Sequence, residues 1–254
     1  MAQVINSKDN QLIKLASSLN EKKYRKLHAL ALLEGVKIID EAIKTNQIFY
    51  KLFIDENKTE EYKNYLHQVE CEVVYVNSKL IETISPSQTP QGVVAIIKTR
   101  SFEPMVIGGN FLVLDNVQDP GNLGAIIRSA AASNFKNIFM INCVDVYNDK
   151  VVRASMGNLF KTNNYSVTLE QLQNLLSVKQ NYELLLADIE GENIFEVETK
   201  KDATIGIIIG NEGSGASKEV ASLATRVISI PMQNEVESLN AAVSASIIMY
   251  KLIN

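Results

Sequence analysis

Three segments in the C-terminal half carry residue types that can do chemistry, and each follows an apolar run typical of a strand. The first is Asp115-Asn-Val-Gln-Asp-Pro-Gly-Asn-Leu-Gly124, which continues to Arg128. Its Asp119-Pro-Gly predicts a turn into a helix, with Asn122 as the expected N-cap. A helix start offers free N–H groups and a partial positive charge, so this segment can bind a polar or anionic ligand. An ordinary strand–turn–helix junction explains the pattern equally well.

The second segment is a glycine-rich loop, Gly210-Asn-Glu-Gly-Ser-Gly215, which follows the apolar run 205–209. Glycines allow a backbone to approach a ligand closely. The spacing G-x-x-G-x-G differs from the dinucleotide fingerprint G-x-G-x-x-G, which disfavours a nicotinamide-dependent oxidoreductase. It also differs from G-x-x-x-x-G-K-[ST], which excludes a nucleoside-triphosphate P-loop. Alone, such a loop is more often a simple turn.

The third segment is Ile230-Pro-Met-Gln-Asn-Glu-Val-Glu-Ser-Leu-Asn240, which leads into the last helix. Pro231 prevents a central strand from continuing, Ser238 is the expected N-cap, and Asn240 is expected in the first turn. The helix expected over 238–252 is so rich in small residues that something must pack closely against it. That neighbour is the chain itself, a second subunit or a threaded backbone segment.

The elements around these segments alternate between strand and helix patterns. Strands are expected at 111–114, 137–141, 183–187, 204–209 and 226–230, and helices at 122–132, 151–158 and 238–252. Buried apolar strands that alternate with helices indicate a largely parallel sheet covered by helices. Binding sites of such sheets lie beyond the carboxyl ends of the strands, where all three segments fall.

The first hundred residues show a separate, smaller α/β pattern. Helices are expected at 10–19, 36–44, 59–68 and 79–85, and strands at 28–36, 52–54, 73–76 and 92–97. Glu103-Pro and Gly108-Gly interrupt the pattern, so we expect a linker over 101–110 between domains 1–100 and 111–254. A loop inside one domain is the alternative.

Composition narrows the class of protein. The 254 residues contain 46% hydrophobic residues, but no apolar run is long enough to cross a bilayer and the N-terminus lacks a signal-peptide core, so we expect a cytoplasmic protein. Two cysteines and two histidines, without ligand spacing, predict unpaired thiols and no metal. The charge of the chain is unevenly distributed. The net charge of −4 counts against a protein that coats nucleic acid. However, the segment 8–26 contains six basic and two acidic residues, which gives it a local net charge of +4. Taken alone, this charge is more simply explained by a helix face exposed to solvent.

Taken together, the three segments resemble the signature motifs of the SpoU/TrmH branch of the SPOUT methyltransferases. The resemblance lies in Asp115-Asn, Asp119 to Gly124 and Arg128, then in the loop 210–215, and finally in Ile230-Pro-Met and Ser238-Leu-Asn, in that order. The N-terminal segment is similar to the ribosomal-protein-like substrate-binding domain that often precedes such a catalytic domain. That likeness lies in Ile5-Asn-Ser-Lys-Asp-Asn, Lys22-Lys-Tyr-Arg-Lys26 and Leu33-Glu-Gly35.

The resemblance implies an α/β fold with a deep trefoil knot, a feature that is otherwise nearly absent from proteins. It also implies a homodimer that uses S-adenosylmethionine to methylate a ribose 2′-hydroxyl of RNA. The separate N-terminal domain favours 23S ribosomal RNA over tRNA. Base methylation by the same fold and a non-catalytic RNA-binding or ribosome assembly factor are the alternatives.

The resemblance also assigns roles to residues. The residues implied in catalysis are Arg128, Asn122, Glu212, Ser238 and Asn240, and those implied in cofactor binding are Gly210, Ile230 and Leu239, with Met232 and Ala187. The residues implied in RNA binding are Lys8, Lys22, Lys23, Arg25 and Lys26. Because an arginine side chain stays protonated, we expect Arg128 to act as a cation on the alkoxide and the adjacent phosphate. The proton would leave to a phosphate oxygen, to water or to Glu212, while Asn122, Ser238 and Asn240 orient the ribose and Arg128.

Overall fold

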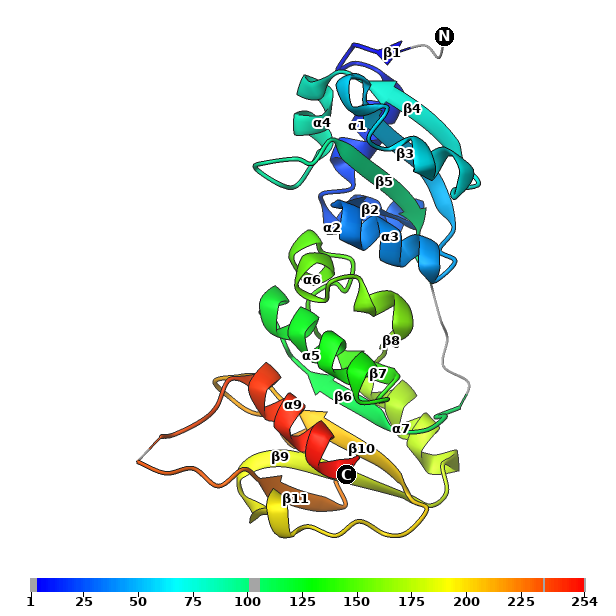
Figure 1. The fold of residues 1–254 in the computed structure, drawn as a ribbon. Helices are drawn as coiled ribbons and strands as arrows, with labels where there is room; N and C mark the ends of the chain where they lie inside the picture. The colour runs from blue at the N-terminus through cyan, green and yellow to red at the C-terminus, as the bar shows by residue number, and fades with distance from the viewer. Residues whose placement is uncertain (1–3, 101–105, 235, 254) are drawn as a thin grey trace. The chain divides into compact units, whose positions relative to one another are not determined.

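The computed structural model describes residues 4–100, 106–234 and 236–253, and the chain forms two compact units (Figure 1). The first unit contains the described residues up to Arg100 together with Tyr147–Phe160. The second contains the remainder, so a segment between β7 and β8 belongs with the first unit, which the expected division at 101–110 did not include. Residues 101–105 of the expected linker lie outside the described residues.

The first unit is built on a five-stranded mixed sheet with the order β1-β4-β3-β5-β2. Strand β5 runs antiparallel to β2 and β3, and the other pairs are parallel. The strands are β1 (Val4–Ile5), β2 (Leu30–Glu34), β3 (Phe49–Asp55), β4 (Glu72–Val76) and β5 (Val93–Lys98). The helices are α1 (Gln11–Ser18), α2 (Lys22–His28), α3 (Val36–Lys44), α4 (Ser78–Ile84) and α6 (Asp149–Ala154), with the 3₁₀ turn η3 (Asn158–Lys161) at the end of the inserted segment.

The helix expected over 59–68 is wrong. The chain forms two short 3₁₀ turns instead, η1 (Glu56–Lys58) and η2 (Lys63–His67). The buried residues here include Tyr62 and Tyr65, whose rings stack with centroids 5.9 Å apart. Residues three apart lie above one another in 3₁₀ geometry, whereas this polar run has no apolar stripe at the α-helical spacing.

The second unit is built on a six-stranded, fully parallel sheet with the order β11-β9-β10-β6-β7-β8. The strands are β6 (Phe111–Asp115), β7 (Asn137–Ile141), β8 (Asn163–Ser166), β9 (Tyr182–Asn193), β10 (Thr204–Ile209) and β11 (Arg226–Ser229). The helices are α5 (Pro120–Ala132), α7 (Leu169–Val178), α8 (Lys218–Ala221) and α9 (Ala241–Leu252), with the 3₁₀ turn η4 (Ile194–Glu196). The prediction of a largely parallel sheet is confirmed, although β8 and α7 were not predicted.

Two helix starts differ from the predicted ones. Asp119, not Asn122, caps α5, since its Oδ1 accepts a hydrogen bond of 2.8 Å from the Asn122 N–H. Pro120 then fills the first helical position, where no N–H is needed. Asn240, not Ser238, caps α9 by accepting from the N–H groups of Ala242 and Val243. The Asn122 side chain therefore does not cap α5 and can contact other residues. Ser238 lies two residues before the N-cap of α9.

The small residues of α9 are explained by close packing on α5 within the same chain. The Ser246 Oγ lies 2.7 Å from the Ser129 Oγ, and the Ser133 hydroxyl donates to the Met249 sulfur at 3.3 Å. Figure 1 shows α5 and α9 side by side over the sheet. No helix in the described part of the chain has the length and apolarity needed to span a bilayer.

Candidate active site

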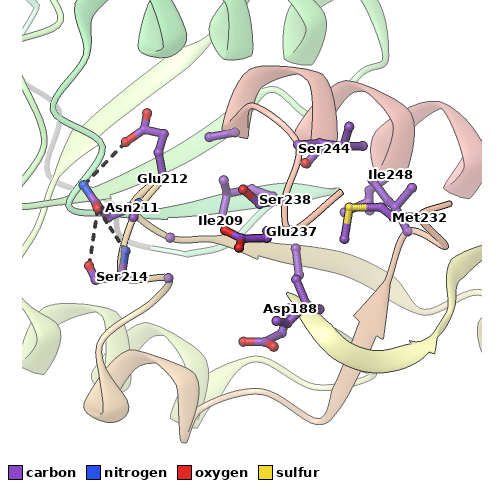
Figure 2. A pocket seen from close by; sticks show the side chains of 18 of the residues that line it. Asp188, Ile209, Asn211, Glu212, Ser214, Met232, Glu237, Ser238, Ser244 and Ile248 are labelled. Atoms are coloured by element: carbon purple, nitrogen blue, oxygen red, sulfur yellow. Dashed lines mark hydrogen bonds between the residues drawn. The ribbon is translucent and has the colours of Figure 1, made fainter. Parts of the chain in front are cut away.

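A cavity of about 410 Å³ lies at the carboxyl ends of β10 and β11 and along the part of β9 that extends beyond β10. Its walls come from β9, the glycine-rich loop, the segment after β11 and the start of α9 (Figure 2). All five residues implied in cofactor binding line this cavity, namely Ala187, Gly210, Ile230, Met232 and Leu239. Glu212 and Ser238 line it as well. Residues of the second and third sequence segments therefore line the same cavity.

The glycine-rich loop folds back on itself and forms a rigid backbone wall. Asn211 and Gly215 exchange two backbone hydrogen bonds of 2.9 Å each. A Cβ atom at Gly210 would lie only 2.1 Å from the carbonyl carbon of Gly215 and from the nitrogen of Ala216. The Oδ1 atom of Asn211 accepts from the N–H of Ser214 at 3.3 Å, a contact drawn in Figure 2. A glycine is thus required at position 210, because the backbone of Gly215 and Ala216 packs against it.

This loop is tied to the first segment at the neighbouring strand end. The buried carboxylate of Asp115 accepts two hydrogen bonds of 2.7 Å, from the N–H and the hydroxyl of Ser217. The Asn211 amide donates to the Asn116 carbonyl at 3.1 Å. Because β6 and β10 are parallel neighbours, their carboxyl ends meet at one edge of the sheet. Asp115 and Asn211 belong to the first two sequence segments, but these hydrogen bonds were not predicted from the sequence.

Three residues implied in catalysis form one hydrogen-bonded chain. The Asn240 Nδ2 donates to the Asn122 Oδ1 at 2.8 Å, and the Asn122 Nδ2 donates to the Glu212 Oε1 at 2.5 Å. The direction is fixed at both ends, because the Asn240 Oδ1 already accepts from the backbone of α9 and a carboxylate can only accept. We call Asn240, Asn122 and Glu212 the amide relay.

Arg128 is not part of the amide relay. It lies six residues after Asn122 on α5, about 120° around the helix at 3.6 residues per turn. Its side chain is exposed, and within the described residues its guanidinium makes no hydrogen bond or ion pair. The structure therefore brings Glu212, Asn122 and Asn240 together, and leaves Arg128 free to meet another molecule.

The cavity has an acidic lining that sequence reasoning did not predict. Asp188, Glu212 and Glu237 line it, whereas no lysine, arginine or histidine among the described residues does. Figure 2 labels all three of these acidic side chains. Apolar side chains such as Ile209, Ile228 and Ile248 supply much of the remaining wall. This combination of carboxylates and apolar surface fits a ligand with a cationic centre and an aromatic ring.

Neither cysteine is a candidate nucleophile. Both Cys71 and Cys143 are free thiols, as predicted, and both are half-buried. Cys143 lies just after β7, and burial raises the pKa of its thiol to about 11. A thiol with that pKa stays protonated at neutral pH and does not attack a substrate.

The residues implied in RNA binding divide into two groups. Lys22, Lys23 and Lys26 are exposed on α2, and Lys8 is exposed before α1. Arg25 is different, because it is only 5% exposed and donates through Nη1 to the carbonyls of Leu19 and Asn20, at 2.8 and 2.9 Å. Its guanidinium holds α2 against the preceding turn, so the assignment of Arg25 to RNA contact is wrong.

Comparisons with known proteins agree with this geometry. The family model of the SpoU rRNA methylases matches residues 109–250, and that of the MRM3-like substrate binding domain matches residues 10–95. An uncharacterized tRNA/rRNA methyltransferase of Synechocystis sp. is 29% identical, over 97% of this chain and 92% of its own. The 23S rRNA (guanosine(2553)-2′-O)-methyltransferase RlmP of Bacillus subtilis is 25% identical over 98% of both chains.

A solved structure extends the likeness to the fold. The crystal structure of an AdoMet-bound rRNA methyltransferase from Sinorhizobium meliloti superposes with a TM-score of 0.86, at 26% identity, over 98% of this chain and 97% of the other. The matched family model spans more than half of the present chain, including all three segments. The chain therefore belongs to the SpoU rRNA methylase family.

Proposed function

We propose that this protein transfers the methyl group of S-adenosylmethionine to a ribose 2′-hydroxyl of large-subunit ribosomal RNA in the cytoplasm. The amide relay carries the proposal, because it places a carboxylate and two oriented amides beside an acid-lined cavity. Amide groups that are held in place can align a ribose without themselves reacting. The relatives named above, one of them a 23S rRNA 2′-O-methyltransferase, support the choice of substrate.

The cofactor supplies a methyl group on a positively charged sulfur. The backbone of Gly210, Ile230 and Leu239 would hold its adenosine part, and Asp188 and Glu237 suit its cationic part. The backbone assignments come from the family resemblance, and the position of these residues in the lining of the cavity supports them.

The reaction removes a proton from the 2′-hydroxyl as its oxygen gains the methyl group. Glu212 accepts that proton, since its carboxylate is held at the end of the relay. Asn122 and Asn240 keep Glu212 and the ribose in line, and Ser238 contacts the ribose from the cavity wall. Arg128 stabilises the negative charge that develops on the 2′-oxygen and neutralises the adjacent phosphate.

Glu212→Gln is expected to slow methyl transfer about 100-fold while S-adenosylmethionine affinity stays within a few-fold. A glutamine Oε1 can still accept the Asn122 hydrogen bond, so the substitution keeps the relay and removes only the proton acceptor. Single-turnover rates measured across pH check this result. An unchanged rate at every pH would remove Glu212 from the proton path.

The homodimer and the trefoil knot that the family implies belong to the same proposal. Arg128 is exposed and makes no hydrogen bond to its own relay, which supports a role for it at the relay of a second copy. Exposed apolar side chains on and beside α9 support a subunit contact there, with Val243 at 47% and Ile253 at 42% exposure. Light scattering in solution tests the dimer against the monomer mass of 28.2 kDa.

Replacing Lys22, Lys23 and Lys26 together with alanine is expected to weaken RNA binding and to lower its salt dependence. Each phosphate contact contributes close to one unit to the slope of log K against log salt, so the slope should fall by about 2 to 3. Filter binding of in vitro transcribed ribosomal RNA at several salt concentrations measures it. The matched control replaces the equally exposed Lys37, Lys44 and Lys79. Equal losses in the two triple variants would show that α2 is not the RNA contact.

The function itself is tested by counting methyl transfer from labelled S-adenosylmethionine to unmodified large-subunit ribosomal RNA, with tRNA in parallel. Alkaline hydrolysis then locates the mark, because a 2′-O-methyl group protects its phosphodiester. Label in a base, or in tRNA alone, would contradict the proposal, as would failure to bind the cofactor.

A further inference from the structure

We propose that the first unit holds one unstacked base of the RNA substrate in a second cavity, at the junction of α2, β2, β3 and β5. This inference rests on the proposed function, because it names a contact of the same RNA. The cavity measures about 420 Å³ and is lined by Leu15, His28, Ala29, Leu30, Tyr50, Lys98 and Thr99. None of these residues belongs to the sequence motifs or to the active-site cavity.

The lining has the chemistry that a single base requires. Leu15 and Leu30 give the cavity an apolar floor, while His28 and Tyr50 contribute aromatic rings. Lys98 and Thr99 add a cation and a hydroxyl. A base presents two apolar faces and a polar edge, and proteins that bind single-stranded RNA stack such faces on aromatic side chains.

Apolar side chains around the cavity are exposed to an unusual degree. Leu27, beside His28, is 68% exposed, and Ile48, whose carbonyl accepts from the Lys98 N–H at 2.9 Å, is 61% exposed. Tyr50 itself is 37% exposed. Isolated exposed apolar residues are ordinary, but a group of them around one cavity indicates a surface that another molecule covers.

The charges around the cavity select RNA over an apolar peptide. The basic helix α2 ends at His28, and the parallel rings of Tyr24 and His28, 6.5 Å apart, connect its lysines to the cavity. Lys23 lies over the Tyr24 ring at 5.6 Å. Among the residues that the structure describes, none of those lining this cavity is acidic. A phosphate backbone that follows α2 would therefore deliver its next base to His28 and Tyr50.

The cavity wall is held rigidly before any RNA arrives. The buried Arg25 ties α2 to the carbonyls of Leu19 and Asn20. Ala29 then adopts the left-handed conformation with φ of 51°, and its carbonyl accepts from the Thr99 N–H at 2.9 Å. Ala29 is the C-cap of α2, and a left-handed residue commonly ends a helix.

Photo-cross-linking tests the contact directly. The full-length protein is irradiated with large-subunit ribosomal RNA transcribed with 4-thiouridine, and the linked peptides are identified by mass spectrometry. We expect cross-links in peptides that contain His28, Tyr50 or Lys98. Cross-links confined to residues 22–26 of α2 or to the second unit would overturn the inference and leave the proposed function intact.

Two matched variants test the stacking. Tyr50→Leu keeps an apolar side chain without a ring and is expected to weaken RNA binding about tenfold. Tyr50→Phe keeps the ring and should retain most of the affinity that Tyr50→Leu loses. S-adenosylmethionine affinity and the thermal midpoint show that both variants fold.

The outcomes separate the two proposals. Equal RNA affinity of Tyr50→Leu and Tyr50→Phe, with native methyl transfer, would overturn the base-binding inference alone and would favour a protein partner for this surface. Absence of RNA binding and of methyl transfer in the unaltered protein would defeat the proposed function, and the inference with it.

Discussion

Arg128→Ala is expected to lower the rate of methyl transfer about 1,000-fold, a larger effect on the chemical step than that expected of Glu212→Gln. The other arginines of the described residues already have hydrogen-bond or ion-pair partners, so Arg128 is the one available to stabilise the charge that develops on the 2′-oxygen. Cofactor affinity should stay within a few-fold, because Arg128 does not line the cavity. Single-turnover kinetics with saturating RNA and calorimetry with S-adenosylmethionine measure the two quantities separately.

The position of Arg128 allows its guanidinium to be removed without breaking other polar contacts. The side chain is exposed and makes no hydrogen bond or ion pair within the described residues, so alanine breaks no polar contact and favours the helix. Arg128→Lys is the matched control, since it keeps the charge and loses the planar guanidinium, and should recover part of the rate. Near-native turnover in Arg128→Ala would show that the assignment is wrong.

Gly210→Ala is expected to abolish cofactor binding and to destabilise the fold by at least about 3 kcal/mol. The added Cβ would lie 2.1 Å from backbone atoms of Gly215 and Ala216, and backbone cannot move aside as a flexible side chain can. Either the loop opens, which breaks its bonds between Asn211 and Gly215, or β10 shifts. Both responses deform the cavity wall.

Gly213→Ala provides the control within the same loop. A Cβ there meets only the Asn211 Oδ1, at 3.6 Å, and its backbone lies outside the left-handed region. We expect a change in the free energy of unfolding within about 0.5 kcal/mol. Thermal unfolding and calorimetry with S-adenosylmethionine compare the two variants. If Gly210→Ala binds the cofactor as well as Gly213→Ala does, the loop is not the cofactor wall.

The apolar runs allowed the parallel sheet to be predicted, because strands buried on both faces carry continuous apolar residues. The capping residues were assigned wrongly, since both helix starts contain two capable side chains. Pro120 decides between Asp119 and Asn122 by occupying the first helical position.

The amide relay was beyond prediction from spacing. Glu212 and Asn240 lie 90 and 118 residues from Asn122, and the pairing of β10 with β6 and the packing of α9 on α5 bring them together. The burial of Arg25 could not be predicted either, because nothing in the sequence distinguishes Arg25 from the neighbouring lysines of the basic run. Its burial depends on the carbonyls of Leu19 and Asn20, which a turn before α2 directs towards it.

The parallel pairing of β6 with β10 also sets the order in which the protein matures on the ribosome. The Ile205 N–H bonds to the Asn110 side chain across 95 residues, so this side of β6 has no partner until β10 emerges. At about 5 to 20 residues per second, that wait lasts about 5 to 20 s. During this time an apolar strand edge is exposed to other nascent chains. We therefore expect the yield of active protein in a cell to depend on the rate of translation and on chaperones that bind extended apolar segments.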